Sequence, residues 1–205
     1  MTDVVFFEND FSNLNVSRLE GFFGDEFNLE VAVKREDQID TFVSGNKFRK
    51  LKYNLIEAQN LRQKTLLTFG GAFSNHIAAT ARAGQRCGFK TIGVIRGEEL
   101  GITLDQTLQQ NPTLKFAYEC GMQFKFVTRK AYREKESAAF NQMLKEQFGD
   151  FYCIPEGGTN ALAVKGCKEI LSENTKDFDY IACAVGTGGT IAGIIEASLP
   201  HQTVL

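Results

Sequence analysis

The sequence predicts an α/β fold in which parallel β-sheets are flanked by helices. Short apolar segments, with the length and composition of buried strands, alternate with longer amphipathic segments along most of the chain. Three of the apolar segments lead directly into glycine-rich or polar loops. The 205 residues are 43% hydrophobic and 23% charged, which is ordinary for a globular protein with a sizeable core. Strand–helix alternation of this kind is typical of parallel sheets with helices on both faces.

The first half of the chain supplies three strands and two helices of this pattern. The strands are predicted at 29–34, 65–70 and 90–97. A helix at 47–63 is amphipathic, so one of its faces should pack inward. A second helix, at 75–88, ends at a glycine, which is common just after a helix C-terminus.

The second half continues the alternation after a less regular segment at 104–121, in which Pro112 occupies a helix-start position. Strands and helices then alternate at 122–127, 133–149, 151–155, 160–173, 179–186 and 189–199. No repeat, low-complexity segment or Pro/Ser-rich linker is present. Parallel sheets bind ligands beyond the carboxyl ends of their strands. The loops after the strands are therefore where we expect the functional site.

Composition excludes several classes of partner. The net charge is −2, and the one basic cluster is too small for a nucleic-acid surface: Lys47, Arg49, Lys50 and Lys52. The first residues are acidic and do not resemble a signal peptide, and no apolar run approaches the ~20 residues of a membrane span. We therefore expect no nucleic-acid or membrane partner.

The cysteines and histidines indicate neither a disulfide framework nor a metal site. The cysteine count is odd, at five, and no CxxC pair occurs. Buried free thiols are the expected state, and reduced thiols suit a cytoplasmic protein. His76 and His201 are the only histidines, and no second ligand is spaced with His76 as a metal site requires.

The loop Gly186–Thr190, with the sequence GTGGT, is the strongest local signal. It follows an apolar strand and opens an apolar helix. The glycines Gly186, Gly188 and Gly189 let the backbone approach a ligand, and the N–H groups and dipole of a helix N-terminus favour an anion. Thr187 and Thr190 add hydroxyl donors, so the ligand group indicated is a phosphate.

Two common phosphate loops do not match this segment. A P-loop requires a lysine after the glycines, and none follows here. A dinucleotide fingerprint requires a third glycine where this chain has Ile191, which disfavours NAD. A tight strand–helix turn without any ligand is the alternative.

Lys47 is the lysine that leans toward the interior of the predicted helix at 47–63. It lies at the edge of the apolar face, one turn before Leu51. That face consists of Phe48, Leu51, Leu55 and Ala58. The helix dipole, neighbouring cations and partial burial all disfavour a charge on Lys47, and a neutral amine can attack a carbonyl. From the local sequence alone a solvated lysine is the commoner arrangement. Arg49, Lys50 and Lys52 are predicted to lie on the helix surface.

A third polar loop, Ser74-Asn75-His76, follows a strand and two glycines and opens a helix of small residues. Ser and Asn are good N-cap residues, which accounts for one of them. Helix amides together with Ser74 and Asn75 would also suit a carboxylate or a ring hydroxyl. No G-x-S-x-G nucleophile elbow is present.

Three separated segments of the chain resemble one family in the same order and spacing. They are VKREDQIDTFVSGNKFRKLKY, TFGGAFSNHIAATARAGQRCG, and IPEGGTNALAVKGCKEI continuing to DYIACAVGTGGTIAG. They look like the 1-aminocyclopropane-1-carboxylate deaminase/D-cysteine desulfhydrase group of pyridoxal-phosphate (PLP) enzymes, which have a tryptophan-synthase-β-like fold. The resemblance covers roughly residues 32–197, and the GNK, SNH and GTGGT elements together are far more specific than any one of them.

The resemblance implies a role for each loop. Lys47 would form the Schiff base with PLP and act as a catalytic residue, and Asn75 would contact the ring hydroxyl. Ser74 would bind the substrate carboxylate and assist catalysis, with His76 and Gly157 bordering the substrate. The phosphate would be held by Gly186, Thr187, Gly188, Gly189 and Thr190.

The resemblance also implies a reaction, a partner and a location. The expected activity is a PLP-dependent elimination from a small amino acid, such as D-cysteine, to pyruvate, ammonia and sulfide. Cyclopropane ring opening is the alternative. Members of the deaminase branch commonly carry Gln where this chain has His76, which favours the desulfhydrase-like branch. The family is typically a cytoplasmic homodimer.

The family architecture implies two domains. Residues 1–50 and 155–205 would form part of a large PLP-binding domain, and 51–154 a smaller α/β domain. Members of the family continue considerably beyond the point where this chain ends, so we expect an incomplete large domain. This leaves a truncated, non-catalytic PLP-binding protein as a further alternative. A milder departure is Ser44, where the family pattern usually has Gly.

Overall fold

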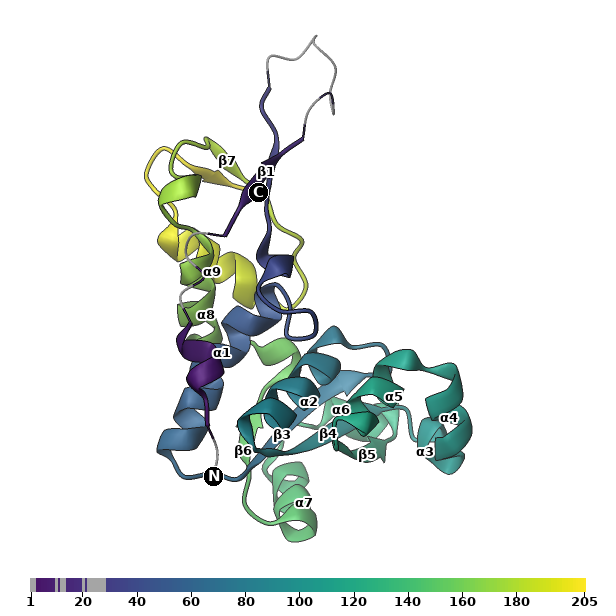
Figure 1. Cartoon of the computed structure of the whole chain (residues 1–205). Helices are drawn as coiled ribbons and strands as arrows, with labels where there is room; N and C mark the ends of the chain where they lie inside the picture. Colours follow the sequence, from purple (N-terminus) through teal and green to yellow (C-terminus); the bar gives the residue numbers. More distant parts are fainter. Residues whose placement is uncertain (1–2, 10, 12–13, 20, 22–28) are drawn as a thin grey trace.

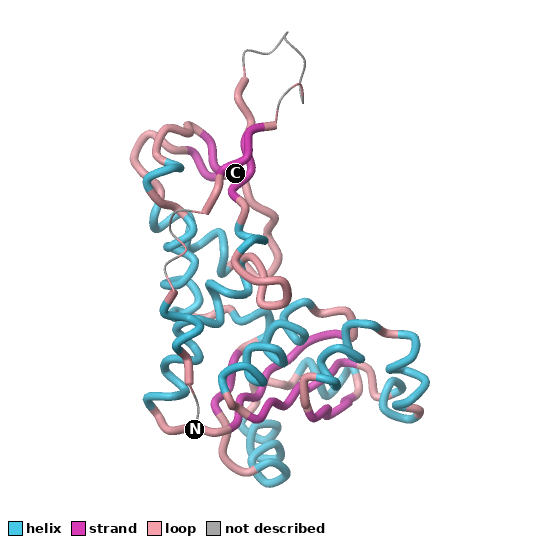
Figure 2. Tube along the Cα trace, viewed as in Figure 1, coloured by secondary structure: helices cyan, strands magenta, loops and turns pink. Residues whose placement is uncertain are grey.

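The computed structural model describes residues 3–9, 11, 14–19, 21 and 29–205 (Figure 1). A four-stranded sheet with its helices forms one part of the molecule, and a group of helices with two short sheets stands beside it (Figures 1 and 2). The predicted α/β class is confirmed. Among the helices within the described ranges, none combines the length and apolarity that a bilayer crossing requires.

The central sheet is entirely parallel and has the strand order β5-β4-β3-β6. Its strands are β3 (Thr65–Gly71), β4 (Lys90–Arg96), β5 (Gln123–Val127) and β6 (Tyr152–Ile154). The middle of β3 and β4 is buried on both faces, as expected for a parallel sheet that is covered by helices. The register pairs Thr65 with Lys90, so both strands end at the same edge.

Helices cover both faces of this sheet. On one face α2 (Asn75–Cys87) and α5 (Pro112–Glu119) enclose an apolar cluster, and on the other α6 (Arg129–Arg133) and α7 (Ala138–Phe148) enclose a second. Two short helices, α3 (Glu99–Ile102) and α4 (Leu104–Gln110), precede α5. Pro112 is the first residue of α5, as predicted from its helix-start position.

The second part of the molecule is built around α1 (Asn46–Asn60), α8 (Ala161–Cys167) and α9 (Gly189–Ala197). The two-stranded sheets are β1 (Val16–Arg18) with β2 (Ala32–Lys34), antiparallel, and β7 (Tyr180–Ile181) with β8 (Thr203–Val204), parallel. Five 3-10 helices complete the described elements: Val5–Glu8, Glu36–Gln38, Glu156–Gly158, Lys168–Ile170 and Glu173–Thr175.

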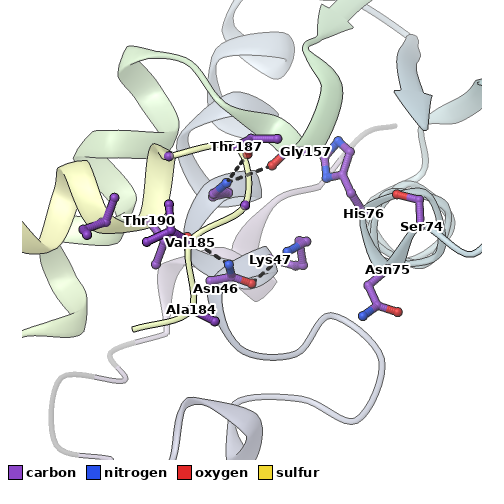
Figure 3. Close-up of a pocket in the computed structure, with 14 residues that line it drawn as sticks. Asn46, Lys47, Ser74, Asn75, His76, Gly157, Ala184, Val185, Thr187 and Thr190 are labelled. Carbon is purple, nitrogen blue, oxygen red and sulfur yellow. Dashed lines mark hydrogen bonds between the residues drawn. The ribbon is translucent and has the colours of Figure 1, made fainter. Parts of the chain in front are cut away.

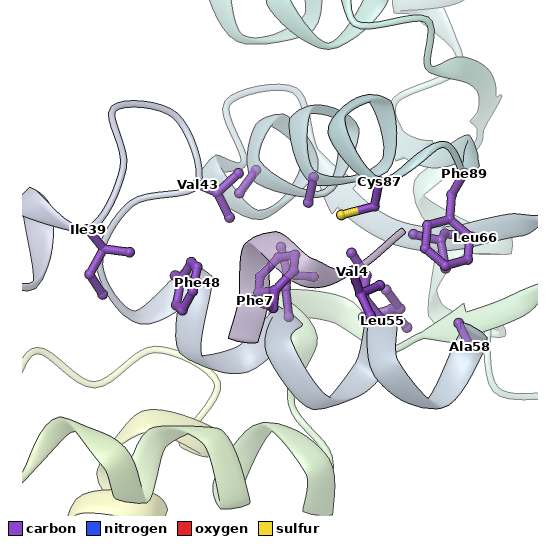
Figure 4. Packing of buried hydrophobic residues seen from close by; sticks show 14 residues of the cluster. Val4, Phe7, Ile39, Val43, Phe48, Leu55, Ala58, Leu66, Cys87 and Phe89 are labelled. Atoms are coloured by element: carbon purple, nitrogen blue, oxygen red, sulfur yellow. The ribbon is translucent and has the colours of Figure 1, made fainter. Parts of the chain in front are cut away.

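The apolar face of α1 packs as its periodicity predicts. Phe48, Leu51, Leu55 and Ala58 are fully buried, in one cluster with residues of α2, β3 and the 3-10 helix at Val5–Glu8 (Figure 4). The Phe48 ring stacks on Phe7 at a centroid distance of 4.8 Å. This cluster joins the two parts of the molecule and fixes the position of the first turn of α1.

Several elements differ from their predicted extents. The strand predicted at 29–34 covers only Ala32–Lys34, and the less regular segment at 104–121 is mostly helical. The strand predicted at 179–186 is short, because β8 offers it only two paired residues. The helix predicted at 133–149 begins later, as α7 at Ala138, where Ser137 caps it by accepting a hydrogen bond from the Phe140 N–H, and the shorter α6 precedes the predicted range. The helix predicted at 160–173 ends at Cys167 and continues as a 3-10 turn.

The thiols also differ in part from the prediction. All five cysteines are free, and Cys87, Cys120 and Cys167 are buried as expected. Cys153 is instead exposed, because it belongs to the edge strand β6. Cys183 is partly buried.

The prediction that Arg49 and Lys50 lie on the helix surface is wrong: their side chains are 2% and 3% exposed. Arg49 donates to Glu36 Oε2 at 2.8 Å, to Glu169 Oε2 at 3.4 Å and to the Phe11 carbonyl at 3.0 Å. The cause is that α8 and the 3-10 helix at Glu36–Gln38 cover the faces of α1 opposite its apolar stripe. Lys52 also pairs with Glu169, at 2.7 Å.

Replacing Arg49 by leucine should destabilise the chain by about 3 kcal/mol, because it leaves the nearly buried Glu36 carboxylate without its partner. Arg35→Leu is the matched control. Arg35 pairs with Asp37 on the same 3-10 helix, but both groups are exposed, so its loss should change the unfolding free energy far less. Chemical denaturation of both variants tests this. Equal losses would contradict the role assigned to the buried pair.

Candidate active site

The predicted loops meet in one pocket of about 350 Å³ (Figure 3). Four segments line it: the first turn of α1, the start of α2, the loop after β6 and the loop that enters α9. The lining residues are Asn46, Lys47, Lys50, Ser74, Asn75, His76, Gly157, Ala184, Val185, Gly186, Thr187, Gly188, Thr190 and Ile191. Every site residue predicted from the sequence is among them except Gly189, which is buried at the first position of α9.

Lys47 is partly buried in this pocket. Its Nζ donates a hydrogen bond to Asn46 Oδ1 at 2.9 Å, and the Asn46 amide donates to Thr190 Oγ1 at 2.9 Å. Burial, and then the neighbouring charge of Lys50, lower the pKa of Lys47 below its ordinary value of 10.5, while Cys167 opposes the shift. Asn46 thus connects the lysine to the glycine-rich loop, and the amine is easier to deprotonate than in water.

Lys50 enters the same pocket from the next turn of α1. Its Nζ donates to the Gly157 carbonyl at 3.0 Å, to Thr159 Oγ1 at 3.1 Å and to Thr187 Oγ1 at 3.2 Å. Burial lowers its pKa as well. All three acceptors are neutral, so a buried cation lies at the glycine-rich loop without an anionic partner among the residues that line the pocket.

The loop before α9 is open to a ligand. A side chain on Gly186 or Gly188 would meet nothing within 4 Å, and Gly188 has a φ of +82°, which favours glycine. The loop leads into α9, whose N-terminus carries no side-chain cap. Free N–H groups, the positive end of the helix dipole and Lys50 together make this end of the pocket suited to a phosphate.

The Ser74-Asn75-His76 triplet lies across the pocket from this loop (Figure 3). Ser74 is the N-cap of α2, and its hydroxyl accepts a hydrogen bond from the Ile77 N–H at 3.4 Å. This is the N-cap role that its residue type suggests. Asn75 is exposed, whereas His76 is 2% exposed and bonded through Nε2 to Thr68. Across the described ranges, no group of three or more His, Cys, Asp or Glu side chains could hold a metal ion.

Sequence reasoning missed three polar contributors: Asn46, Lys50 and Thr159. Asn46 was visible only as part of the GNK element, and Thr159 only as part of the EGGTN loop. Thr159 is hydrogen-bonded to Thr187, so it ties the loop after β6 to the glycine-rich loop. None of the three has a local signal that separates it from an ordinary polar residue.

Gly157 is where the loop after β6 comes closest to the glycine-rich loop. A Cβ there would lie 2.7 Å from Thr187 Oγ1, at a φ of +66°. Gly157→Ala should therefore cost about 1 kcal/mol of stability from the backbone and also displace Thr187, which weakens binding of a phosphate ligand.

Gly121→Ala is the matched control for Gly157→Ala. Gly121 also has a positive φ, of +86°, but a Cβ there would meet nothing within 4 Å. Both variants should lose stability by a similar amount in thermal unfolding. Only Gly157→Ala should weaken phosphate-ligand binding in calorimetry, and equal binding by both variants would contradict the predicted displacement of Thr187.

Comparison with known proteins identifies relatives of this chain. A family model described as "Pyridoxal-phosphate dependent enzyme" matches residues 14–203. A putative 1-aminocyclopropane-1-carboxylate deaminase of Thermotoga maritima is 36% identical over 83% of this chain and 54% of its own length. The bifunctional D-cysteine desulfhydrase/1-aminocyclopropane-1-carboxylate deaminase of Arabidopsis thaliana is 34% identical over 80% of this chain and 44% of its own length.

A solved structure gives the same result. The crystal structure of an ACC deaminase homologue superposes with a TM-score of 0.68 and 28% identity, covering 90% of this chain and 55% of that one. The chain therefore spans about half the length of the relatives it matches. Because the family model matches residues 14–203, the chain belongs to the pyridoxal-phosphate dependent enzymes, and it is similar to proteins named as 1-aminocyclopropane-1-carboxylate deaminases and as a D-cysteine desulfhydrase.

Proposed function

We propose that this chain binds PLP covalently through Lys47 and acts as a lyase or deaminase on a small amino acid, with D-cysteine as the preferred substrate class. The observation that carries the proposal is the convergence, in one pocket, of an amine with a lowered pKa and a cationic, glycine-rich anion site. PLP carries an aldehyde, which can react with the amine, and a phosphate, which can occupy the anion site.

The hydrogen-bond donors and the amine in the pocket match the chemical groups of PLP. At the phosphate end Lys50, Thr187, Thr190 and the amides that start α9 are donors, and none of the residues that line the pocket is acidic. At the other end Lys47 offers an amine held by Asn46. The proposal assigns Gly186–Thr190 to the phosphate and Asn75 to the ring hydroxyl.

The substrate would lie against the start of α2. We assign its carboxylate to Ser74 and the helix amides that follow, with His76 and Gly157 as walls of the pocket. PLP, when bound, supplies the electron sink of the reaction. The contribution of the chain is the amine of Lys47, which takes the proton from the substrate α carbon and returns it later. A lowered pKa suits this task, because a neutral amine is needed near neutral pH.

Two activities compete under this proposal, and one residue discriminates between them. The names of the relatives include both D-cysteine desulfhydrase and 1-aminocyclopropane-1-carboxylate deaminase. His76 stands where the deaminase branch commonly has glutamine, which supports D-cysteine. β-Elimination from D-cysteine followed by hydrolysis yields pyruvate, ammonia and sulfide, so atoms balance with one water.

The test is keto-acid release from D-cysteine and from 1-aminocyclopropane-1-carboxylate by the PLP-loaded 205-residue chain. Faster release from D-cysteine, accompanied by equimolar sulfide, is the expected result. Covalent PLP binding without any turnover would instead assign the chain as a non-catalytic PLP-binding protein. Absence of covalent binding in the folded chain would reject the cofactor assignment itself.

We also propose the organisation expected from the sequence: residues 51–154 as the smaller domain, residues 1–50 and 155–205 as part of the larger one, a homodimer, and a cytoplasmic location. The smaller domain is supported by the four-stranded sheet, whose strands all lie between Thr65 and Ile154. Light scattering of the purified chain measures the oligomeric state, and a mass equal to one chain would reject the dimer.

A further inference from the structure

His76 projects from the first turn of α2 into the pocket between Lys47 and Gly157 (Figure 3). Its imidazole is 2% exposed. One nitrogen, Nε2, lies 2.9 Å from Thr68 Oγ1. The other, Nδ1, is buried without a hydrogen-bond partner in the described part of the chain. A buried polar atom without a partner is costly, so its presence calls for an explanation.

The hydrogen bonds of Thr68 fix the tautomer of His76. The Thr68 hydroxyl lies 2.9 Å from the Ile154 carbonyl, which can only accept, so its single proton is donated there. Thr68 must then accept from His76, and the proton of the imidazole resides on Nε2. Burial, and then the charges of Lys47 and Lys50, lower the pKa of His76 to about 3, so the ring is neutral. Nδ1 therefore presents a lone pair.

A lone pair at this place excludes some ligand groups and selects others. Phosphate and carboxylate oxygens are acceptors and would be repelled, whereas an N–H or O–H group would supply the missing bond. Lys50 donates to three oxygens already. The amine of Lys47 donates to Asn46 alone among the described residues, so it retains protons to donate.

We propose that His76 is a positioning residue whose Nδ1 accepts a hydrogen bond from a primary amine in the pocket. The amine has two possible sources, Lys47 itself and the amino group of an amino-acid substrate. The second source rests on the proposed function, and the first does not. In either case His76 orients an amine by a fixed acceptor and takes no proton itself.

The first experiment is 15N NMR of imidazole-labelled protein carrying His201→Asn, which leaves His76 as the only histidine. The expected spectrum is that of a neutral ring protonated at Nε2, unchanged down to pH 5. A ring protonated at Nδ1, or one that titrates above pH 5, would overturn the proposal. This measurement needs no cofactor, so it can succeed even if the PLP assignment fails.

Two further arms identify the amine. In the PLP-free protein, Lys47→Met should shift the Nδ1 resonance if Lys47 is the donor. In the PLP-free Lys47→Ala protein, where the amine of D-alanine cannot condense with an aldehyde, D-alanine should shift it if the substrate amine is the donor, whereas propionate, which has the carboxylate without the amine, should not. A shift in either arm supports the proposal. An Nδ1 resonance that moves in neither arm, or that responds equally to propionate, overturns it.

A pair of variants separates the two nitrogens of His76. His76→Gln can keep a donor toward Thr68 but has no atom at the Nδ1 position, and His76→Asn has an acceptor near Nδ1 but cannot reach Thr68. If the substrate amine is the donor, the affinity ratio of D-alanine to propionate should fall about tenfold in His76→Gln, the worth of about one hydrogen bond, and be largely kept in His76→Asn. If Lys47 is the donor, the ratio should be the same in both variants and in the wild type. Equal falls in both would assign His76 a purely structural role.

Discussion

Lys47→Ala should abolish covalent attachment of PLP and reduce turnover of any amino-acid substrate by about 10³-fold or more. The amine that bonds the cofactor and the base that moves the α proton are the same group in the proposed site, and both are lost together. The fold should be preserved, because among the residues that the structure describes the Lys47 side chain donates one hydrogen bond, to its neighbour Asn46, and has no ion-pair partner. Borohydride reduction followed by mass spectrometry measures the attachment.

Lys52→Ala is the control for Lys47→Ala. Lys52 lies on the same helix, and its Nζ pairs with Glu169 at 2.7 Å, away from the pocket. It should retain PLP attachment at Lys47 and activity. PLP found on another lysine of the wild-type chain, or attachment that survives in Lys47→Ala, would contradict the assignment.

The pH dependence of PLP attachment follows from the same geometry. Attack on an aldehyde requires the neutral amine, whose fraction rises as pH rises through the pKa of Lys47. Burial and the charge of Lys50 lower that pKa, so the midpoint of the attachment rate should lie below the ordinary 10.5. Lys50→Met removes the second cause and should move the midpoint upward. A stopped-flow pH profile of both proteins measures it, and an unchanged midpoint would contradict coupling between the two lysines.

The features of this protein that the sequence predicts are those set by local pattern. Strands β3 and β4 and helices α1 and α2 lie within a few residues of their predicted bounds, because apolar periodicity and end signals such as Gly88 act over a few residues. The GTGGT, GNK and SNH elements could be recognised individually. The SNH loop and the loop after β6 meet because they leave neighbouring strands at one edge of the parallel sheet. The GNK element lies on α1 and the GTGGT loop follows β7 of a separate sheet, so the packing of helices brings these two into the same pocket.

The features that sequence reasoning missed depend on neighbours distant in the chain. Arg49 is buried because Glu36 and Glu169 converge on it from two other segments, and neither is marked as a partner in the sequence. Helical phase relative to a single apolar face places Lys50 on the surface. Since α8 packs on another face of α1, a residue off the apolar stripe can still be interior.

Lys50→Met should weaken PLP binding about 10- to 100-fold, while barely changing the binding of pyridoxal, which has no phosphate. The physical reason is the loss of a charged hydrogen-bond donor beside a dianion, worth about 1.5–3 kcal/mol. Lys50 is 3% exposed and its pKa is lowered by burial, so the folded chain holds this cation at a cost in desolvation. An anion that replaces its neutral partners offsets that cost.

The comparison of the two ligands separates an effect on the phosphate from an effect on the fold. Lys50→Met removes the cost of burying a cation but leaves the Gly157 carbonyl without its donor, so these two effects on stability oppose each other. Lys165→Met, an exposed lysine whose Nζ lies 4.1 Å from the centre of the Tyr53 ring, controls for the substitution itself. Each variant is titrated with PLP and with pyridoxal in a calorimeter. The ratio of the affinity for PLP to that for pyridoxal should fall in Lys50→Met and stay unchanged in Lys165→Met. If the affinities for both ligands fall equally, Lys50 stabilises the loop and does not bind the phosphate. The phosphate must then be bound by the α9 amides and the threonines alone.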